Sequence, residues 1–334
     1  MVQSYDANVI NEEFRFATST VTNGLLANLT DGADRFDASG VSLATTIRGG
    51  GGNDSIVGST GNDSIEGGLG DDFLDGGAGN DQLNGQGGDD TLAGGEGLDT
   101  LLGGAGRDSL SGGAGNDRLN GQGGADTITG GRGNDCLIGG DGIDVLKEEA
   151  DVNFTLTTAT LVGQGTDRLA QFEKAKLIGG DGANVLDASG SNLLVTLIGG
   201  GGNDMLTQRR VAIRYLGWCD GSDTLIGNAG HDSISGGLAN DLVVGGAGND
   251  RLSGDAGEDT LTGGSGNDQL LGGSDTDTLV GGLGNDTLDG GEGVDHIAGG
   301  NGRNRGRRAS DVFVDPISGL DEAINVLTKW LTGI

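Results

Sequence analysis

The chain has 334 residues with 74 glycines, one proline, 3% aromatic residues and a formal net charge of −31. It lacks the large apolar side chains from which a globular core of this length is built, and its negative charge argues against nucleic acid and other polyanions as partners. Ordering each glycine costs roughly 0.5–1 kcal/mol more than ordering alanine. We therefore expect a compact fold only where counter-ions neutralise the carboxylates.

Residues 1–48 precede the periodic part of the chain and are predicted to form an N-terminal cap and an entrance segment. Val9, Ile10, Phe14 and Phe16 supply apolar cover for the predicted cap. The first thirty or so residues show no apolar run between a basic start and a small-residue cleavage site, so no signal peptide is predicted.

Residues 49–147 repeat every nine residues without an insertion and form the first predicted roll. The frame is G-G-x-G-N-D-x-L-x, and we number its positions 1 to 9. Position 8 is aliphatic in all eleven units, from Ile56 to Leu146. Position 6 is aspartate in every unit: Asp54, Asp63, Asp72, Asp81, Asp90, Asp99, Asp108, Asp117, Asp126, Asp135 and Asp144.

The frame combines the groups that a calcium site needs. Ca²⁺ takes six to eight oxygen ligands and mixes carboxylates with backbone carbonyls. The glycines allow backbone conformations that turn carbonyls toward a common point, and the aspartate supplies charge. Positions 7 to 9 predict a short strand with one side chain inward. A disordered Gly- and Asp-rich linker is the alternative, but a linker has no reason to keep aspartate and an aliphatic residue at fixed positions.

Residues 148–198 lose the period and are predicted to form a bridging or capping β segment followed by a second entrance. Val152, Phe154 and Leu156 alternate as in a half-buried strand. Residues 181–204 align without a gap to residues 31–54 and are identical at fifteen of 24 positions, which indicates an internal duplication. Asn184 stands where the first copy has Asp34, so the entrance turn is a weaker candidate ion site.

Residues 199–307 form the second predicted roll. Its candidate metal ligands are Asp204, Asp223, Asp232, Asp241, Asp250, Asp259, Asp268, Asp277, Asp286 and Asp295. Several turns are eroded: Asn228 and Asp255 replace the second glycine, and Ala239 and Asp275 the third. The irregular residues 208–219 have two interpretations, an inserted surface loop for a partner or a short frameshifted stretch of repeat; we favour the second slightly because repeats flank both sides.

The tail begins with the arginine-rich residues 301–308, interpreted as an eroded last repeat rather than a basic patch. Residues 308–334 form the predicted C-terminal tail, and Ser318 with Asp321 resembles a helix-capping box. Leu320, Ile324, Leu327, Leu331 and Ile334 follow at helical spacing, which predicts an amphipathic helix.

The predicted fold is all-β: a right-handed parallel β-roll, or β-solenoid, with two calcium-binding arrays, short caps and the C-terminal helix. Two nonapeptides would make one coil, so each turn lies beside the turn of the next unit but one. Eleven units then give nine turn pairs and the second array gives seven, for up to roughly 16 calcium ions with about 32 positive charges against the net −31.

The nonapeptide resembles the RTX, or haemolysin-type calcium-binding, repeat family. The resemblance implies secretion through a type I system with an uncleaved address near the C-terminus, and hence an extracellular or cell-surface location. No transmembrane span is expected. The implied partners are calcium, the type I secretion machinery and a cell-surface or glycan ligand.

The sequence predicts no enzyme. Its two histidines, His231 and His296, lie in repeats, and neither an H-E-x-x-H nor a G-x-S-x-G motif occurs. We expect a secreted calcium-binding structural or surface-matrix protein that folds on binding extracellular Ca²⁺. The alternative is a non-catalytic, calcium-dependent module that assists a carbohydrate-modifying or other secreted enzyme.

Overall fold

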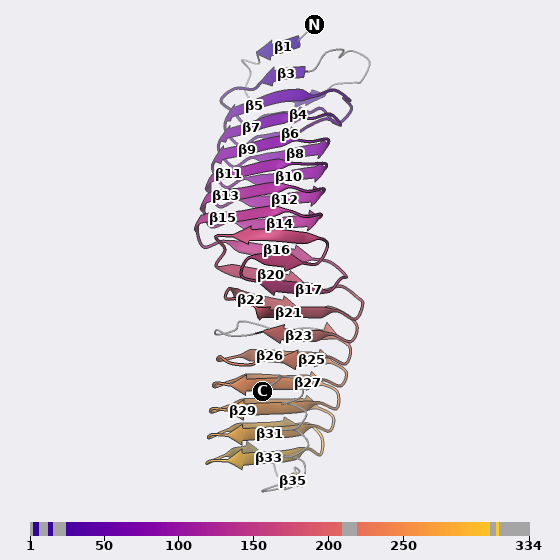
Figure 1. Ribbon diagram of the computed structural model, residues 1–334, viewed down its shortest axis with the longest axis vertical. Coiled ribbons are helices and arrows are strands. Elements are labelled where there is room, and N and C mark those ends of the chain that lie inside the picture. Colours follow the sequence, from indigo (N-terminus) through magenta and orange to yellow (C-terminus); the bar gives the residue numbers. More distant parts are fainter. Residues whose placement is uncertain (1–2, 7–12, 16–24, 209–218, 308–311, 314–334) are drawn as a thin grey trace. The chain divides into compact units, whose positions relative to one another are not determined.

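A computed structural model describes residues 3–6, 13–15, 25–208, 219–307 and 312–313, and every regular element in these residues is a β-strand (Figure 1). No helix in this described part is long and apolar enough to cross a membrane. The predicted C-terminal helix from Ser318 lies outside the described residues, as do residues 209–218 of the irregular segment. The side chains predicted to cover the N-terminal cap are likewise not described.

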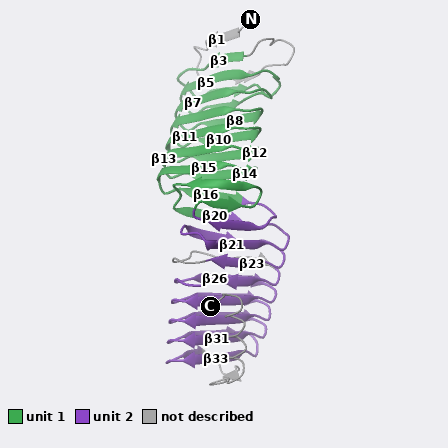
Figure 2. Ribbon diagram, in the orientation of Figure 1, with its two compact units in different colours: residues 1–148, 159–175 green, residues 149–158, 176–334 purple. Residues whose placement is uncertain are grey.

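The chain divides into two compact units (Figure 2). Unit 1 contains residues 1–148 and 159–175, and unit 2 contains residues 149–158 and 176–334. The predicted bridging segment is therefore shared: residues 159–175 belong to unit 1, and its other residues from 149 onward belong to unit 2.

Unit 1 consists of two parallel sheets whose strands alternate along the chain. The first sheet contains β1 (Gln3–Asp6), β3 (Leu25–Asn28), β5 (Thr45–Gly51), β7 (Ser64–Leu69), β9 (Gln82–Gly87), β11 (Thr100–Gly106), β13 (Arg118–Gly124), β15 (Cys136–Gly142) and β19 (Thr166–Ala170), with β18 (Thr160–Val162) antiparallel to β19. The second contains β2 (Glu13–Arg15), β4 (Arg35–Asp37), β6 (Ser55–Val57), β8 (Phe73–Ala78), β10 (Thr91–Glu96), β12 (Ser109–Ala114), β14 (Thr127–Arg132) and β16 (Val145–Glu149).

Unit 2 repeats this alternation, and β20 (Lys174–Ile178) contributes residues to both units. Its first set of strands is β17 (Phe154–Thr157), β21 (Val185–Gly190), β23 (Met205–Gln208), β25 (Thr224–Ile226), β27 (Leu242–Ala247), β29 (Thr260–Ser265), β31 (Thr278–Leu283), β33 (His296–Asn301) and β35 (Val312–Phe313). The second set is β22 (Leu194–Ile198), β24 (Cys219–Asp220), β26 (Ser233–Leu238), β28 (Arg251–Ala256), β30 (Gln269–Ser274), β32 (Thr287–Gly291) and β34 (Arg305–Arg307).

The strand register confirms that two nonapeptides make one coil. Leu92 pairs with Leu110 in parallel, and Leu101 pairs with Leu119, so a coil contains eighteen residues. Equivalent repeat positions therefore stack directly on one another, and position 6 of one unit lies beside position 6 of the next unit but one.

The aliphatic residues at position 8 form the thin core. The eleven of the first roll are at most 1% exposed, and Leu206, Leu225 and Leu261 of unit 2 are fully buried. In the bridging region Phe154 and Leu156 are also fully buried, as their alternation predicts.

At three places the spacing between paired residues departs from eighteen. Phe36 pairs with Ile56 and Leu186 with Leu206, so each of the two entrance segments forms a coil of twenty residues. This common length supports an internal duplication. The irregular residues 208–219 fall in a coil of nineteen residues, because Leu206 pairs with Leu225. This coil is one residue longer than the regular eighteen, and residues 209–218 themselves lie outside the described part of the chain.

The basic tail also begins as a repeat. Thr287 pairs with Arg305 and Leu288 with Gly306, at the regular spacing of eighteen residues. The interpretation as an eroded last unit therefore agrees with the register, and Gly306 leaves the core position of that unit without a side chain.

Candidate metal centres

All of the predicted metal ligands are buried carboxylates. Each of the 21 aspartates at position 6 is at most 3% exposed. The parallel coils stack them into columns at the turns. Alternate nonapeptides contribute to the same column, so each array has two columns. Burial of so many carboxylates requires that each oxygen have a partner, because an unpaired charge in a buried place is strongly unfavourable.

One oxygen of each carboxylate takes part in a backbone ladder. The N–H of Asp54 donates to Oδ1 of Asp72, and the N–H of Asp72 donates to Oδ1 of Asp90, both at 2.8 Å. The same bond recurs between successive aspartates of every column at 2.7–2.9 Å. Aspartate at position 6 thus joins neighbouring coils even without an ion.

The other oxygen has no donor. In twenty of the 21 aspartates Oδ2 is buried and makes no hydrogen bond with the protein. A buried acceptor left unsatisfied costs about 1–3 kcal/mol, and more when it is charged. Repetition of this cost along every column indicates that the turns are built around a cation.

Position 1 provides space and a second oxygen at the same place. A methyl group built on Gly76 would lie 2.5 Å from Oδ2 of Asp81 and 2.7 Å from the carbonyl oxygen of Gly94, which is position 1 of the next coil. Gly112 has the same neighbours, Oδ2 of Asp117 and the carbonyl oxygen of Gly130, both at 2.6 Å. A carboxylate oxygen and a carbonyl oxygen therefore face a common space that any side chain at position 1 would fill.

Positions 2 and 4 use the left-handed backbone region: apart from Gly61 in the Asp63 turn, the glycines at these positions of the two arrays have φ between +77° and +151°. The eroded turns keep this conformation without glycine: Asn228, Ala239, Asp255 and Asp275 have φ of 70°, 75°, 74° and 80°. A non-glycine residue in this region costs roughly 1–2 kcal/mol. Because the aspartates of these turns also keep a free Oδ2, the eroded turns retain the geometry of the others.

Asparagine at position 5 makes a second ladder that the sequence reading did not assign. Oδ1 of Asn80 accepts the N–H of Leu98 at 2.8 Å, and Oδ1 of Asn116 accepts that of Asn134 at 2.7 Å. His231 occupies this position in unit 2, and its Nδ1 accepts the N–H of Asn249 at 2.7 Å. The frequent asparagine at position 5 was the sequence signal for this ladder. The hydrogen bond between coils explains why asparagine is frequent there.

Asp63 differs from the other predicted ligands. Its Oδ2 accepts the N–H of Ser59 at 2.6 Å, and its Oδ1 accepts the Ser59 hydroxyl at 3.0 Å as well as the N–H of Thr45. Ser59 replaces the second glycine of this turn. Both carboxylate oxygens of Asp63 therefore have protein partners, which makes this turn the weakest candidate metal site among the 21.

The columns also extend beyond the predicted ligands. The N–H of Asp135 donates to Oδ1 of Asp167, and the N–H of Asp144 donates to Oε2 of Glu173, both at 2.9 Å. Asp34 precedes Asp54 in the same way at 2.8 Å. Residues 163–169 fit positions 2 to 8 of a unit, which is the signal that could have identified Asp167. Glu173 has no such signal, because its turn lacks glycine.

Neutral residues stand at two column ends in unit 2. Asn184 accepts the N–H of Gly180 and donates to Asp151 at 3.1 Å, so its amide is satisfied within the protein. This agrees with the expectation that the second entrance turn is a weaker ion site. Asn304 closes another column by accepting the N–H of Asp286 at 2.9 Å.

Burial raises the pKa of the buried carboxyls because it disfavours their charged form. The pKa rises from 3.8 to about 7 for Asp54, Asp108 and Asp241 and to about 6 for Asp81 and Asp117. The backbone N–H on Oδ1 offsets part of this rise, while neighbouring aspartates of the column add to it. A metal-free turn at neutral pH is thus electrostatically strained.

The available donors fit a hard cation. Among the described residues no three His, Cys, Asp or Glu side chains converge on one metal position, so the carboxylates must act together with backbone carbonyls. This all-oxygen, mixed set is the one that Ca²⁺ prefers, while soft metals take thiolate or imidazole. In bound form the ion would supply charge to the free Oδ2 atoms and join successive coils.

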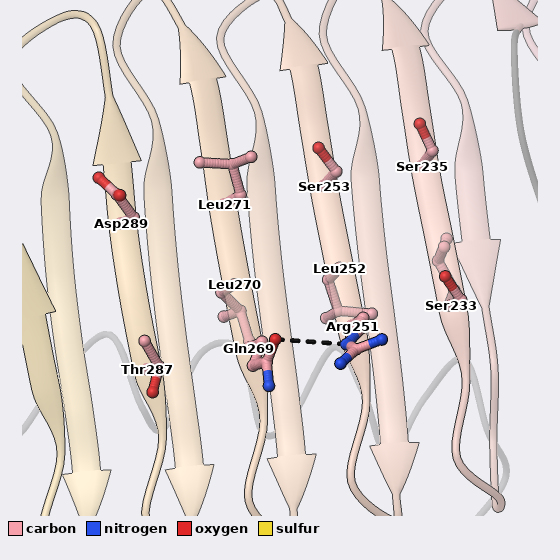
Figure 3. Close-up of a pocket in the computed structure, with 11 residues that line it drawn as sticks. Ser233, Ser235, Arg251, Leu252, Ser253, Gln269, Leu270, Leu271, Thr287 and Asp289 are labelled. Atoms are coloured by element: carbon pink, nitrogen blue, oxygen red, sulfur yellow. Dashed lines mark hydrogen bonds between the residues drawn. The ribbon is translucent and has the colours of Figure 1, made fainter.

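A separate feature is a hollow of 370 Å³ on the outer face of β26, β28, β30 and β32 in unit 2 (Figure 3). Two rows of outward side chains cross these strands in register. The rows are Ser233, Arg251, Gln269 and Thr287, and Ser235, Ser253, Leu271 and Asp289. Arg251 donates to Gln269 at 3.3 Å. Ile234, Leu252 and Leu270 also line the hollow, so it combines an apolar surface with hydroxyl, amide and charged groups.

Comparison with known families agrees with the geometry of the turns. The model of the RTX calcium-binding nonapeptide repeat matches residues 48–83, 84–119, 111–146, 195–207, 220–252, 235–270, 244–279 and 271–305, which together make up more than half of the chain. The chain belongs to the RTX calcium-binding repeat family. No curated protein matches it. The RTX matches include every predicted aspartate ligand, whereas Asp167 and Glu173 lie outside them.

The contrast between Asp81 and Asp63 can be measured. We expect Asp81→Asn to raise the calcium concentration needed for folding by severalfold, because it removes charge from a free, buried oxygen. Asp63→Asn should raise it less, since both oxygens of Asp63 already have hydrogen-bond partners. Calcium titrations followed by circular dichroism test this, and equal shifts in the two variants would contradict the distinction.

The raised pKa values predict opposite pH effects with and without calcium. Carboxyls such as Asp54 and Asp108 have a pKa of about 7 in the fold against 3.8 ordinarily, so the folded metal-free chain retains protons that the unfolded chain releases. Its stability should be greatest below about pH 4 and fall as the pH rises toward 7. Because protons and calcium compete for the same oxygens, the calcium midpoint should rise as the pH falls from 8 to 6. Circular dichroism in EGTA at pH 5 and pH 8 checks the first effect; equal β-structure at both would refute it.

Proposed function

We propose that this RTX-repeat chain is a secreted structural or surface-matrix protein that folds when it binds extracellular Ca²⁺. The observation that carries the proposal is the set of twenty buried aspartate oxygens without a hydrogen-bond donor. They recur once per unit at the turns, where position 1 leaves space and a carbonyl oxygen. At neutral pH and above, a cation between coils would satisfy all of them at once.

The proposed number of ions is up to roughly 16, one for each pair of stacked turns in the two arrays. That number would bring about 32 positive charges to a chain with a net charge of −31. Neutralisation on this scale would remove the repulsion within the aspartate columns. The Asp63 turn is the first candidate for a turn that stays without an ion.

The calcium requirement supports the proposed extracellular location. Extracellular calcium is millimolar, and sites in extracellular modules bind with a Kd of about 10⁻⁴–10⁻³ M. A chain with such sites would remain unfolded where calcium is scarce and fold where it is abundant. This behaviour suits export of an unfolded chain by type I secretion machinery, followed by folding outside the cell.

We infer that the chain is not an enzyme. Its aspartates are committed to backbone ladders and to the proposed ions, so they are poorly placed for acid–base chemistry. His231 uses Nδ1 to accept the N–H of Asn249 and so serves the position-5 ladder. The role that remains is mechanical: a calcium-stabilised β-roll built from acidic repeats.

The decisive test is far-UV circular dichroism of the full chain, titrated from EGTA to about 10 mM calcium. We expect a change from disorder to β-structure with calcium, since calcium supplies the missing partners of the buried oxygens. Magnesium should fail at the same concentration because it demands octahedral geometry and releases its waters reluctantly. A chain that is fully folded in EGTA would rule out calcium-dependent folding.

A second candidate is a non-catalytic, calcium-dependent module that contacts carbohydrate for a partner enzyme, and the hollow on unit 2, with polar groups beside an apolar lining, favours it. Arg251 and Gln269 lie side by side there and present hydrogen-bonding groups outward (Figure 3). On this reading the calcium-loaded chain should bind members of a glycan array, and Arg251→Ala should weaken binding by about tenfold through loss of a charged hydrogen bond. Arg118→Ala on unit 1 is the matched control. Absence of glycan binding at saturating calcium would leave the structural role.

A further inference from the structure

The last repeat turn of unit 1, residues 139–144, is followed by a segment that is not a repeat. Asp144 is fully buried, and its Oδ1 accepts the N–H of Asp126 at 2.9 Å. Its Oδ2 has no hydrogen-bond partner. The turn therefore has the same unsatisfied oxygen as the turns before it, although no nonapeptide follows to complete the site.

A carbonyl from the non-repeat segment takes the place of the missing glycine carbonyl. In the preceding turn of the column, a methyl group built on Gly121 would meet the carbonyl oxygen of Gly139 at 2.6 Å. A methyl group built on Gly139 would meet the carbonyl oxygen of Gln171 instead, together with Oδ2 of Asp144 at 2.7 Å. Gln171 has a φ of 56°. This left-handed conformation costs a non-glycine residue roughly 1–2 kcal/mol, so the surrounding structure must hold the backbone in it.

Glu173 takes the place of the missing aspartate. Its Oε2 accepts the N–H of Asp144 at 2.9 Å, the bond that the aspartate of the next coil makes in every earlier turn of the column. Glu173 thus places a second carboxylate beside Asp144, whose own Oδ2 is buried without a donor.

The other edge of unit 1 ends differently. Around a methyl group built on Gly130, the nearest atoms belong to Asp135 and Leu137, and no carbonyl of a later coil is among them. Glu148 instead accepts the N–H groups of Gly130 and Gly131 at 2.6 and 3.4 Å. The combination of a free aspartate oxygen, a nearby carbonyl oxygen and a second carboxylate is therefore found at the Asp144 edge, whereas the carbonyl oxygen is missing from the nearest atoms around Gly130.

We propose that Asp144, the carbonyl of Gln171 and the carboxylate of Glu173 form a calcium site that the nonapeptide does not encode. The ion joins residues 166–173 to the last repeat turn and so closes the open end of the aspartate column. The proposal rests on the proposed calcium-dependent folding of the repeats and adds a site and a role to it: calcium orders the bridging segment of unit 1 as well as the roll.

The test uses the full-length chain and hydrogen exchange measured by mass spectrometry at increasing free calcium. Peptides that cover residues 159–175 should become protected as calcium rises. Glu173→Gln keeps an oxygen that can accept the N–H of Asp144 but removes the charge. We expect it to raise the calcium midpoint of these peptides by at least about tenfold, since charge count sets calcium affinity, while peptides from residues 100–124 keep their midpoint.

Glu96→Gln is the matched control, because Glu96 is an exposed glutamate of unit 1 at position 3 of its turn. It removes the same charge and should shift neither midpoint. An unchanged midpoint for residues 159–175 in Glu173→Gln would overturn the proposal, as would wild-type protection of this segment in EGTA. Loss of its protection at every calcium concentration would also overturn it, because Glu173 would then be required for packing alone. If the wild-type repeats themselves show no calcium-dependent protection, the proposed function fails instead.

Discussion

Each aspartate at position 6 places one carboxylate oxygen in a backbone ladder and buries the other without a donor. The ladder fixes the carboxylate at the turn, so the free oxygen cannot turn outward to water. Burial raises the pKa of these carboxyls, to about 7 for Asp54 and Asp108, because the charged form lacks compensation. A cation supplies that compensation, and the spacing of the coils, the glycines and the strand register all serve to present oxygens to it.

The thin core cannot replace the ions. Each nine-residue repeat buries one aliphatic side chain, such as Leu101 or Leu119, between the two sheets. The favourable contribution of such a residue is about 1.5–3 kcal/mol, whereas fixing the backbone of each of the nine residues costs about 1–2 kcal/mol. Asparagine at position 5 and aspartate at position 6 add bonds between coils, but these bonds replace bonds to water. Metal binding is the remaining large favourable contribution.

In a solenoid each coil contacts only its neighbours, so the ends of a column need a different solution from its interior. Unit 2 closes two column ends with neutral asparagines, Asn184 and Asn304, which need no ion. Unit 1 closes its columns with acidic residues from the bridging segment, Asp167 and Glu173. Asp63, the first aspartate of its column, shows a third solution: Ser59 donates hydrogen bonds to both of its carboxylate oxygens, which in other turns leave one oxygen without a donor.

The sequence alone determined the periodic part of the fold. A nine-residue period with fixed glycine, aspartate and aliphatic positions permits one arrangement, in which equivalent positions stack every eighteen residues, and Leu92 and Leu110 pair accordingly. The burial of the 21 predicted aspartates follows from the same period. Only the tertiary structure decided where the period fails. The roles of Gln171 and Glu173 depend on which residues the bridging segment brings beside Asp144. The hydrogen bonds of Asp63 depend on where the backbone places Ser59. Contacts between residues distant in the sequence, without a repeat to fix their register, leave no periodic signal in the chain.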